Sequence, residues 1–239
     1  MANRTPSAHR TLLSRRDPKD EEHHVRSVVV LGLGRFGSAL AVELTRLGVE
    51  VLGVDQDETV VQDHDGRLTH VVRADIPREE VHSQLGVRDA DRVVVAVGGR
   101  LEASVLACSH LLRAGVEDLW AKAESADHAQ ILDQLGVAHV IKPQHETGQR
   151  VAHRIADRAE EWVTYGRGFA MGLFPVPNRL LHRTAADARI AERFDVRLIA
   201  RCPAGRDWEY VSLQTTFNPG DQLIVAGQEA NLERFGRLD

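Results

Sequence analysis

The chain has few cysteines and no long apolar run, and these absences exclude several classes of protein. Its two cysteines, Cys108 and Cys202, lie far apart and without partners at metal-ligand spacing. This fits a reducing cytoplasm and argues against a disulfide framework or a zinc site. No uninterrupted apolar segment approaches the roughly 20 residues that a membrane-spanning helix needs. We therefore expect a soluble cytoplasmic protein.

The chain also lacks an excess of positive charge. Its formal net charge is -5, so there is no overall basic field, and nucleic acid is not an expected partner. Residues 1–26 have no apolar core of a signal peptide and mix basic with acidic side chains, so we expect a disordered tail. His23 and His24 have no clustered ligand nearby, and we predict no metal site there.

A strand followed by closely spaced glycines is the most informative stretch. Val28–Leu31 is a run of branched apolar residues, typical of a strand buried on both faces, and it leads into Gly32-Leu33-Gly34-Arg35-Phe36-Gly37. In this G-x-G-x-x-G spacing, Gly32 permits a tight turn and Gly34 lets a pyrophosphate approach the main chain. Gly37 lets the next helix pack against the strand. The predicted ligand is a nucleotide.

An acidic residue follows the second apolar strand. Asp55 lies about 20 positions beyond the glycines, where a carboxylate would accept hydrogen bonds from a ribose diol. The alternative is that Asp55 caps the next helix.

From Ser27 onwards, short β-branched runs alternate with longer amphipathic ones, as in a parallel sheet covered by helices. The expected strands are Val28–Leu31, Val49–Val54, His70–Arg73, Arg92–Val97, Asp118–Lys122 and His139–Ile141. The expected helices are Phe36–Leu47, Glu58–Asp65, Arg78–Leu85, Glu102–Ala114 and Ala126–Leu135. Glycine follows four of them, at Gly48, Gly86, Gly115 and Gly136. We predict an α/β domain with a Rossmann-like, doubly wound parallel sheet over residues 27–145.

Ligands of such sheets lie outside the carboxyl ends of the strands, so the residues there are candidate nucleotide contacts. Besides the glycine motif they are Asp55, Gln56, Ala74, Asp75, Val97, Gly98, Glu102 and Lys122. Asp75 either faces the base of a nucleotide or caps the helix that Pro77 begins. Lys122 either reaches a phosphate or is a solvated lysine at the end of a strand.

The composition changes beyond residue 145. A helix is expected over Glu146–Trp162, and with Gly166 and Gly168 it forms a linking helix and hinge over residues 146–168. Residues 169–239 are expected to form a small α+β domain. Its predicted elements are a helix at Thr184–Phe194 and strands at Val196–Arg201, Glu209–Leu213 and Leu223–Ala226.

Several short stretches together resemble the RCK domains that regulate potassium transport. In the first domain they are the glycine motif, Val54-Asp55, Thr69-His70, Ala74-Asp75, Glu102-Ala103-Ser104, Ala121-Lys122-Ala123, Gly136 and Val140-Ile141-Lys142-Pro143. In the second they are Val176-Pro177, Asp187, Phe194-Asp195-Val196 and Gly220-Asp221-Gln222-Leu223-Ile224-Val225-Ala226-Gly227. The resemblance covers nearly everything after residue 26.

The resemblance implies regulation and not catalysis. A single RCK unit in a chain of this length resembles the KtrA-type subunit more than the two-unit TrkA form. Such subunits form dimers that assemble into an octameric ring beneath a KtrB- or TrkH-like membrane transporter, which implies a cytoplasmic protein held peripherally at the membrane. ATP or ADP is the expected ligand, with NAD(H) as the alternative, and Arg35 is expected to sense the phosphates.

Two positions depart from the family pattern. A glutamate that contributes to a divalent-cation site commonly follows the proline of Val-Ile-x-Pro, and here that position is Gln144, although Glu146 is close by. An amide is a poorer ligand for a hard cation than a carboxylate, so no metal site is expected. The Asp-Ile-Arg segment associated with cyclic di-AMP in some relatives reads Arg189-Ile190-Ala191 here, which leaves that ligand open.

The competing hypothesis is an NAD(P)-dependent oxidoreductase, for which the first domain would also serve. A dehydrogenase needs a general acid or base at the nicotinamide, whereas His153 and His182 stand alone in the sequence. A nucleotide-responsive transcription regulator would need a basic helix-turn-helix, and none is evident.

Overall fold

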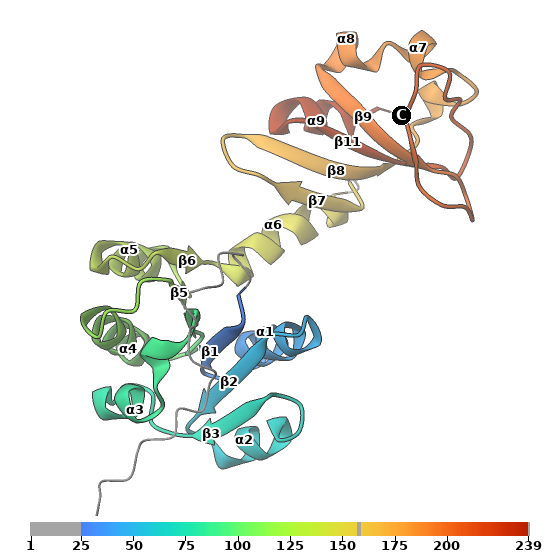
Figure 1. Ribbon diagram of the computed structural model, residues 1–239. Coiled ribbons are helices and arrows are strands. Elements are labelled where there is room, and N and C mark those ends of the chain that lie inside the picture. The colour runs from blue at the N-terminus through green and yellow to red at the C-terminus, as the bar shows by residue number, and fades with distance from the viewer. Residues whose placement is uncertain (1–24, 157–158, 239) are drawn as a thin grey trace, which may run out of the picture. The chain divides into compact units, whose positions relative to one another are not determined.

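The computed structural model describes residues 25–156 and 159–238. The chain divides into two compact units, and the division falls between Gln144 and His145. Figure 1 shows the helices and strands of each unit. Among the described residues, none of the helices combines the length and the apolarity that crossing a bilayer requires.

The first unit is built on a six-stranded parallel sheet with the strand order β3-β2-β1-β4-β5-β6. Its strands are β1 Ser27–Leu31, β2 Glu50–Asp55, β3 His70–Arg73, β4 Arg92–Val95, β5 Leu119–Lys122 and β6 His139–Ile141. Its helices are α1 Arg35–Arg46, α2 Glu58–His64, α3 Glu79–Gln84, α4 Leu101–Arg113 and α5 Ala126–Leu135, with a 3-10 turn at Val87–Asp89. The predicted doubly wound sheet is confirmed.

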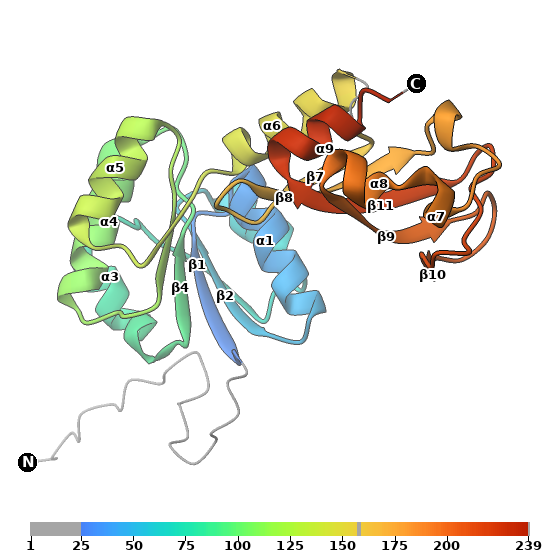
Figure 2. The same ribbon diagram turned by 90° about the horizontal axis from the view of Figure 1, so that it is seen from above.

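Two apolar clusters cover the two faces of this sheet. Val28 and Val30 belong to the cluster that includes Ala41 of α1, and Val29 and Leu31 belong to the cluster that includes helix α4. Figure 2 shows α1 on one side of the sheet and α3, α4 and α5 on the other. Because successive side chains of a strand point to opposite faces, burial on both faces explains the continuous apolar run.

Glycine ends four of the first unit's helical segments as predicted. Gly48, Gly86, Gly115 and Gly136 all have positive φ, between 65° and 89°. This left-handed conformation is the one that glycine adopts without the steric cost of a Cβ atom.

The second unit contains a five-stranded antiparallel sheet with the order β10-β9-β11-β8-β7. The strands are β7 Glu161–Thr164, β8 Phe169–Pro175, β9 Val196–Cys202, β10 Glu209–Tyr210 and β11 Gln222–Gln228. The helices are α6 Pro143–Ile155, which begins at the division, α7 Ala185–Ala188, α8 Ile190–Phe194 and α9 Glu229–Phe235, with a 3-10 turn at Asn178–Leu180. Phe174 of β8 packs edge-on against Phe235 of α9, with ring centroids 5.2 Å apart.

Three of the helices and strands predicted for the second half are wrong in detail. The helix expected to reach Trp162 ends at Ile155, and Trp162 lies in β7, paired with β8. The expected hinge glycines, Gly166 and Gly168, form the turn of this β7–β8 hairpin, in which the Tyr165 N–H donates to the carbonyl of Phe169.

The other two differences are a broken helix and a shortened strand. The helix expected over Thr184–Phe194 is interrupted by Arg189, whose φ is +47°, so the structure has α7 and α8 in its place. The strand expected to reach Leu213 ends at Tyr210.

Candidate nucleotide-binding site

The turn from β1 into α1 requires glycine at two of its three glycine positions. Gly32 has a φ of +98°, and a Cβ atom there would lie 3.0 Å from the backbone of Ala96 and Val97. A Cβ atom on Gly37 would lie 1.9 Å from the carbonyl oxygen of Gly32. Gly32 and Gly37 therefore allow the helix to start directly against the strand.

Gly34 differs from its neighbours because the space beside it is open. A Cβ atom on Gly34 would meet nothing within 4 Å, and Gly34 is the N-cap of α1 without a side-chain cap. The first backbone N–H groups of a helix have no partner inside the helix, and they favour an anion. The turn is therefore suited to a phosphate group.

Asp55, the last residue of β2, reaches the same turn. Its Oδ2 accepts a hydrogen bond from the N–H of Leu33 at 2.7 Å, and its Oδ1 accepts one from the N–H of Asp57 at 3.0 Å. The alternative that Asp55 caps the next helix is wrong, because Asp57 is the N-cap of α2 and accepts from the N–H of Thr59. Contact between Asp55 and a ribose stays a prediction.

The other residues of the glycine motif differ in how accessible their side chains are. Leu33 is buried, and Phe36 is half-buried in the same apolar cluster. Leu33 therefore offers its backbone, and not its side chain, to a ligand. Arg35 is the first residue of α1 and is exposed.

Gln56, which follows β2, accepts hydrogen bonds from two arginines of neighbouring segments. Its Oε1 accepts from Arg100 Nη1 at 2.8 Å, and its carbonyl oxygen accepts from Arg73 Nε at 3.1 Å. Sequence reasoning missed both arginines as site residues. Arg73 is the last residue of β3 and Arg100 precedes α4 in the loop after β4. These positions were the available signal, because basic groups at this edge of the sheet favour an anionic ligand.

Ala74 and Asp75 follow β3. The N–H of Ala74 donates to the carbonyl of Asp55 at 2.9 Å, and the Asp75 carboxylate lies 3.1 Å from Arg78 Nε. The N-cap of α3 is Arg78, so the helix-cap alternative for Asp75 is wrong. Its role toward a nucleotide base stays a prediction.

The loop after β4 and the end of β5 bring the remaining predicted residues to this edge. Val97 is half-buried with its backbone against Gly32, whereas Gly98 and Glu102 are exposed. The Lys122 side chain is only 8% exposed, and its Nζ lies 3.1 Å from Glu124 Oε1. The solvated-lysine alternative is therefore wrong.

Glu124 was not predicted, although it lies two residues beyond Lys122 in a strand-end loop. Its Oε2 accepts from the N–H of Gly99 at 2.9 Å. This hydrogen bond, together with Lys122 and with the more distant His128, holds the pKa of Glu124 below its usual value of 4.5, although partial burial opposes the effect. Glu124 is therefore an anion at neutral pH.

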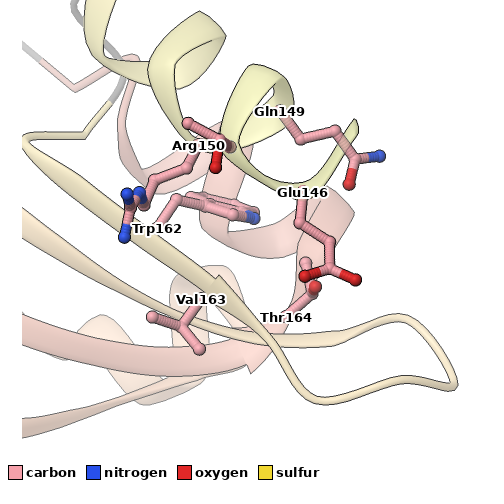
Figure 3. Close-up of a pocket in the computed structure, with 7 residues that line it drawn as sticks. Glu146, Gln149, Arg150, Trp162, Val163 and Thr164 are labelled. Atoms are coloured by element: carbon pink, nitrogen blue, oxygen red, sulfur yellow. The ribbon is translucent and has the colours of Figure 1, made fainter. Parts of the chain in front are cut away.

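The two residues considered for a cation, Gln144 and Glu146, lie on α6 and are exposed. Glu146 lines a hollow of about 380 Å³ between α6 and β7 in the second unit, opposite Trp162 and Thr164. Figure 3 shows this hollow, with Gln149 and Arg150 on the same helix. Within residues 25–156 and 159–238, no three or more histidine, cysteine or acidic side chains are grouped to hold a metal ion.

His153, one of the histidines considered for the oxidoreductase alternative, has a structural partner. Its ring stacks on Trp162, with centroids 3.9 Å apart and an interplanar angle of 7°. The contact joins α6 to β7 inside the second unit.

Comparison with known proteins establishes the family. Residues 28–143 match the TrkA-N domain. Over 208 residues the chain is 33% identical to the Ktr system potassium uptake protein A of Vibrio alginolyticus, covering 87% of this chain and 94% of the relative. The chain belongs to the family of Ktr system potassium uptake proteins. The predicted resemblance to this group of RCK proteins is confirmed.

Other members and a solved structure agree with this assignment. The chain is also 29% identical to the Ktr system potassium uptake protein C of Bacillus subtilis (strain 168), over 88% of this chain and 96% of the relative. The structure of the GsuK channel bound to NAD has the same fold, with a TM-score of 0.53 and 20% identity over 92% of this chain and 38% of the channel chain. The named relatives are potassium uptake proteins, which contradicts the oxidoreductase alternative.

Proposed function

We propose that the chain is a nucleotide-sensing regulatory subunit of a Ktr-type potassium uptake system. The observation that carries this proposal is the match to a Ktr system potassium uptake protein over 94% of that relative's length. The glycine turn, with Asp55 bonded to it, supports a nucleotide as the regulatory ligand.

ATP or ADP is the preferred ligand within this proposal. The open space at Gly34 suits a phosphate, and Arg35 and Lys122 supply the cations that additional phosphates require. NAD(H) is the second candidate, because a protein of the same fold has been solved with NAD bound. The segment Arg189-Ile190-Ala191 departs from the Asp-Ile-Arg pattern and does not support binding of cyclic di-AMP to the second unit.

The partner in this proposal is a KtrB- or TrkH-like membrane subunit that carries the potassium ion, which would place the chain at the cytoplasmic side of the membrane. The chain itself assembles into dimers and an octameric ring. A nucleotide regulates the transporter only to the extent that it binds one state of the ring more tightly than the other. The sign of regulation therefore depends on which nucleotide favours the conducting state.

Calorimetry on the purified protein tests the ligand. We expect ATP and ADP to bind with micromolar dissociation constants, roughly -8 kcal/mol, and more tightly than NAD+. Light scattering with and without nucleotide tests the assembly. Failure of every nucleotide to bind, or a strict monomer under both conditions, would contradict the proposal.

A transport assay tests the function itself. The protein is reconstituted with a Ktr-type membrane subunit in potassium-loaded vesicles, and ion flux is measured with ATP and with ADP. We expect the potassium flux to differ between ATP and ADP. Equal flux with both nucleotides would contradict the proposal that they regulate the transporter.

A further inference from the structure

The buried Lys122 and the exposed Glu124 form an ion pair at the predicted phosphate edge of the first unit. The two groups lie 3.1 Å apart, and the second carboxylate oxygen of Glu124 accepts from the N–H of Gly99 at 2.9 Å. A Cβ atom on Gly98 would lie 3.1 Å from both Lys122 Nζ and Glu124 Oε1. The ion pair therefore packs directly against the loop that follows β4.

This loop is continuous with the glycine turn. The backbone of Val97, one residue before Gly98, lies against Gly32. The donors around Glu124 are thus at the same edge of the sheet as the open position beside Gly34, at the point where β1 and β4 lie side by side and the strand order reverses.

The two partners of Glu124 are donors that also suit a phosphate. A buried ammonium group and a backbone N–H form charge-assisted hydrogen bonds with phosphate oxygens as they do with carboxylate oxygens. In this structure a carboxylate of the same chain uses both. A phosphate and Glu124 cannot accept from Lys122 and Gly99 at the same positions.

The two members of the pair differ in their freedom to move. The side chain of Lys122 is 8% exposed, whereas that of Glu124 is 38% exposed. Lys122 would be costly to leave unpaired, because a buried charge without a partner is strongly destabilising. Glu124 can turn towards water, and His128 holds its backbone through a 3.3 Å hydrogen bond from the Glu124 N–H to Nδ1.

We propose that Glu124 is a built-in competitor for the nucleotide's phosphate. In the empty site it occupies the anion position formed by Lys122 and Gly99, and a phosphate displaces it when the nucleotide binds. The inference rests on the proposed nucleotide site and adds a regulatory residue to it. Glu124 lowers the affinity for phosphate-bearing ligands and keeps Lys122 paired while the site is empty.

Calorimetric titration of E124Q tests the competition. The variant removes the competing charge with little change in shape, so we expect it to bind ATP and ADP about tenfold more tightly than the wild type. Adenosine, which has no phosphate, should bind both proteins equally. D127N is the matched control, because it removes one exposed carboxylate from the first turn of α5 and should leave ATP affinity within about twofold of the wild type.

The role of Lys122 is tested by the double variant. If Glu124 acts through Lys122, E124Q should give no gain in ATP affinity in a K122M background. E124D provides a second measure, because its shorter side chain cannot span the same two donors, and it should bind ATP more tightly than the wild type. Circular dichroism checks that each variant is folded.

Three results would overturn the inference. If the wild type binds ATP and E124Q binds it no more tightly than D127N does, Glu124 is not a competitor, although the proposed function stands. If E124Q weakens ATP binding only when Mg²⁺ is present, Glu124 is a cation ligand. If the wild type binds no nucleotide at all, the proposed function fails and the inference fails with it.

Discussion

The carboxylate of Asp55 is hydrogen-bonded to the backbone N–H of Leu33 at 2.7 Å, across 22 residues of sequence. The residue expected to bind the ribose therefore also holds the glycine turn in place. Its two oxygens serve different partners, since the other one accepts from Asp57. Substitutions at Asp55 should consequently affect both ligand binding and stability.

Asp55→Ala should abolish nucleotide binding and lower the free energy of unfolding by about 1–3 kcal/mol, because two backbone N–H groups lose their acceptor. Asp55→Asn keeps one acceptor oxygen and should retain most of the stability while weakening nucleotide binding at least about tenfold. Calorimetry and denaturant titration measure the two effects. Unchanged binding in both variants would remove Asp55 from the site.

The glycine turn offers a matched pair of substitutions. Gly37→Ala places a Cβ atom 1.9 Å from the Gly32 carbonyl oxygen, so the helix must shift, at a cost of about 2–3 kcal/mol in stability. Gly34→Ala meets nothing within 4 Å, and its φ of -65° suits alanine, so stability should change by less than about 1 kcal/mol. Nucleotide affinity should nevertheless fall in Gly34→Ala, because the Cβ atom occupies the phosphate approach. A Gly34→Ala protein that binds ATP normally would contradict this assignment.

His82 should make the first unit sensitive to acid. The side chain is buried between α3 and α4, with Nε2 bonded to the Ile76 carbonyl at 2.7 Å and its ring 6.2 Å from that of His110. Burial lowers the pKa of His82 below 6.5, although the Ile76 carbonyl opposes the shift; His110 lowers the pKa further, and Glu79 raises it. As the pH falls below about 6.5, His82 is protonated in the unfolded chain before it is protonated in the folded chain. The free energy of unfolding therefore decreases as the pH falls through this range.

The expected result for His82→Gln is a shallower loss of stability between about pH 6.5 and pH 5, because glutamine does not titrate and can still donate to Ile76. His145→Gln removes an exposed histidine and should behave as the wild type. NMR titration of the histidines measures the protonation of His82 directly, and thermal denaturation measures its effect on stability. Identical pH profiles for wild type and His82→Gln would show that another group is responsible.

Gln144→Glu should strengthen divalent-cation binding to the ATP-bound protein. The resemblance to RCK domains implies a carboxylate at this position, and exchanging an amide oxygen for a carboxylate adds one negative charge to a hard cation's ligands. The wild type should respond to ATP with little dependence on added magnesium or calcium. Gln149→Glu adds the same charge further along α6 and is the control. Equal cation affinity in Gln144→Glu and wild type would show that residue 144 does not determine the site, as would be the case if Glu146 replaced it.

Much of the first unit could be predicted from the sequence because its strands and helix ends are specified by residues that are neighbours in the chain. Val28–Leu31 is buried on both faces and therefore reads as an uninterrupted apolar run, and the helices end at glycines with positive φ. The places of Asp55 and Lys122 at strand ends followed from the same pattern. The role of Glu124 did not, because the backbone N–H of Gly99 that holds its carboxylate lies 25 residues away in the sequence.

The second unit was harder to predict because its strands carry ambiguous residues. β8 buries Ala170, Gly172 and Phe174, and a Cβ atom on Gly172 would lie 2.5 Å from the Phe174 ring. The glycine makes room for the aromatic ring, yet in the sequence it weakens the strand signal. The break at Arg189 is also invisible in the sequence, because a non-glycine residue with positive φ is uncommon.

The place of β11 in the second sheet has a consequence for how the chain folds during synthesis. β11 lies between β8 and β9 and is the last strand of the described residues to leave the ribosome. The last of the six strands of the first sheet ends at Ile141. That sheet can therefore form while the second sheet still lacks its middle strand. Until Gln222–Gln228 emerges, the inner edges of β8 and β9 are unpaired and open to contact with other nascent chains. A nascent chain stopped before Gln222 would therefore keep the first sheet, whereas its second sheet would be divided into the β7–β8 pair and the β9–β10 pair.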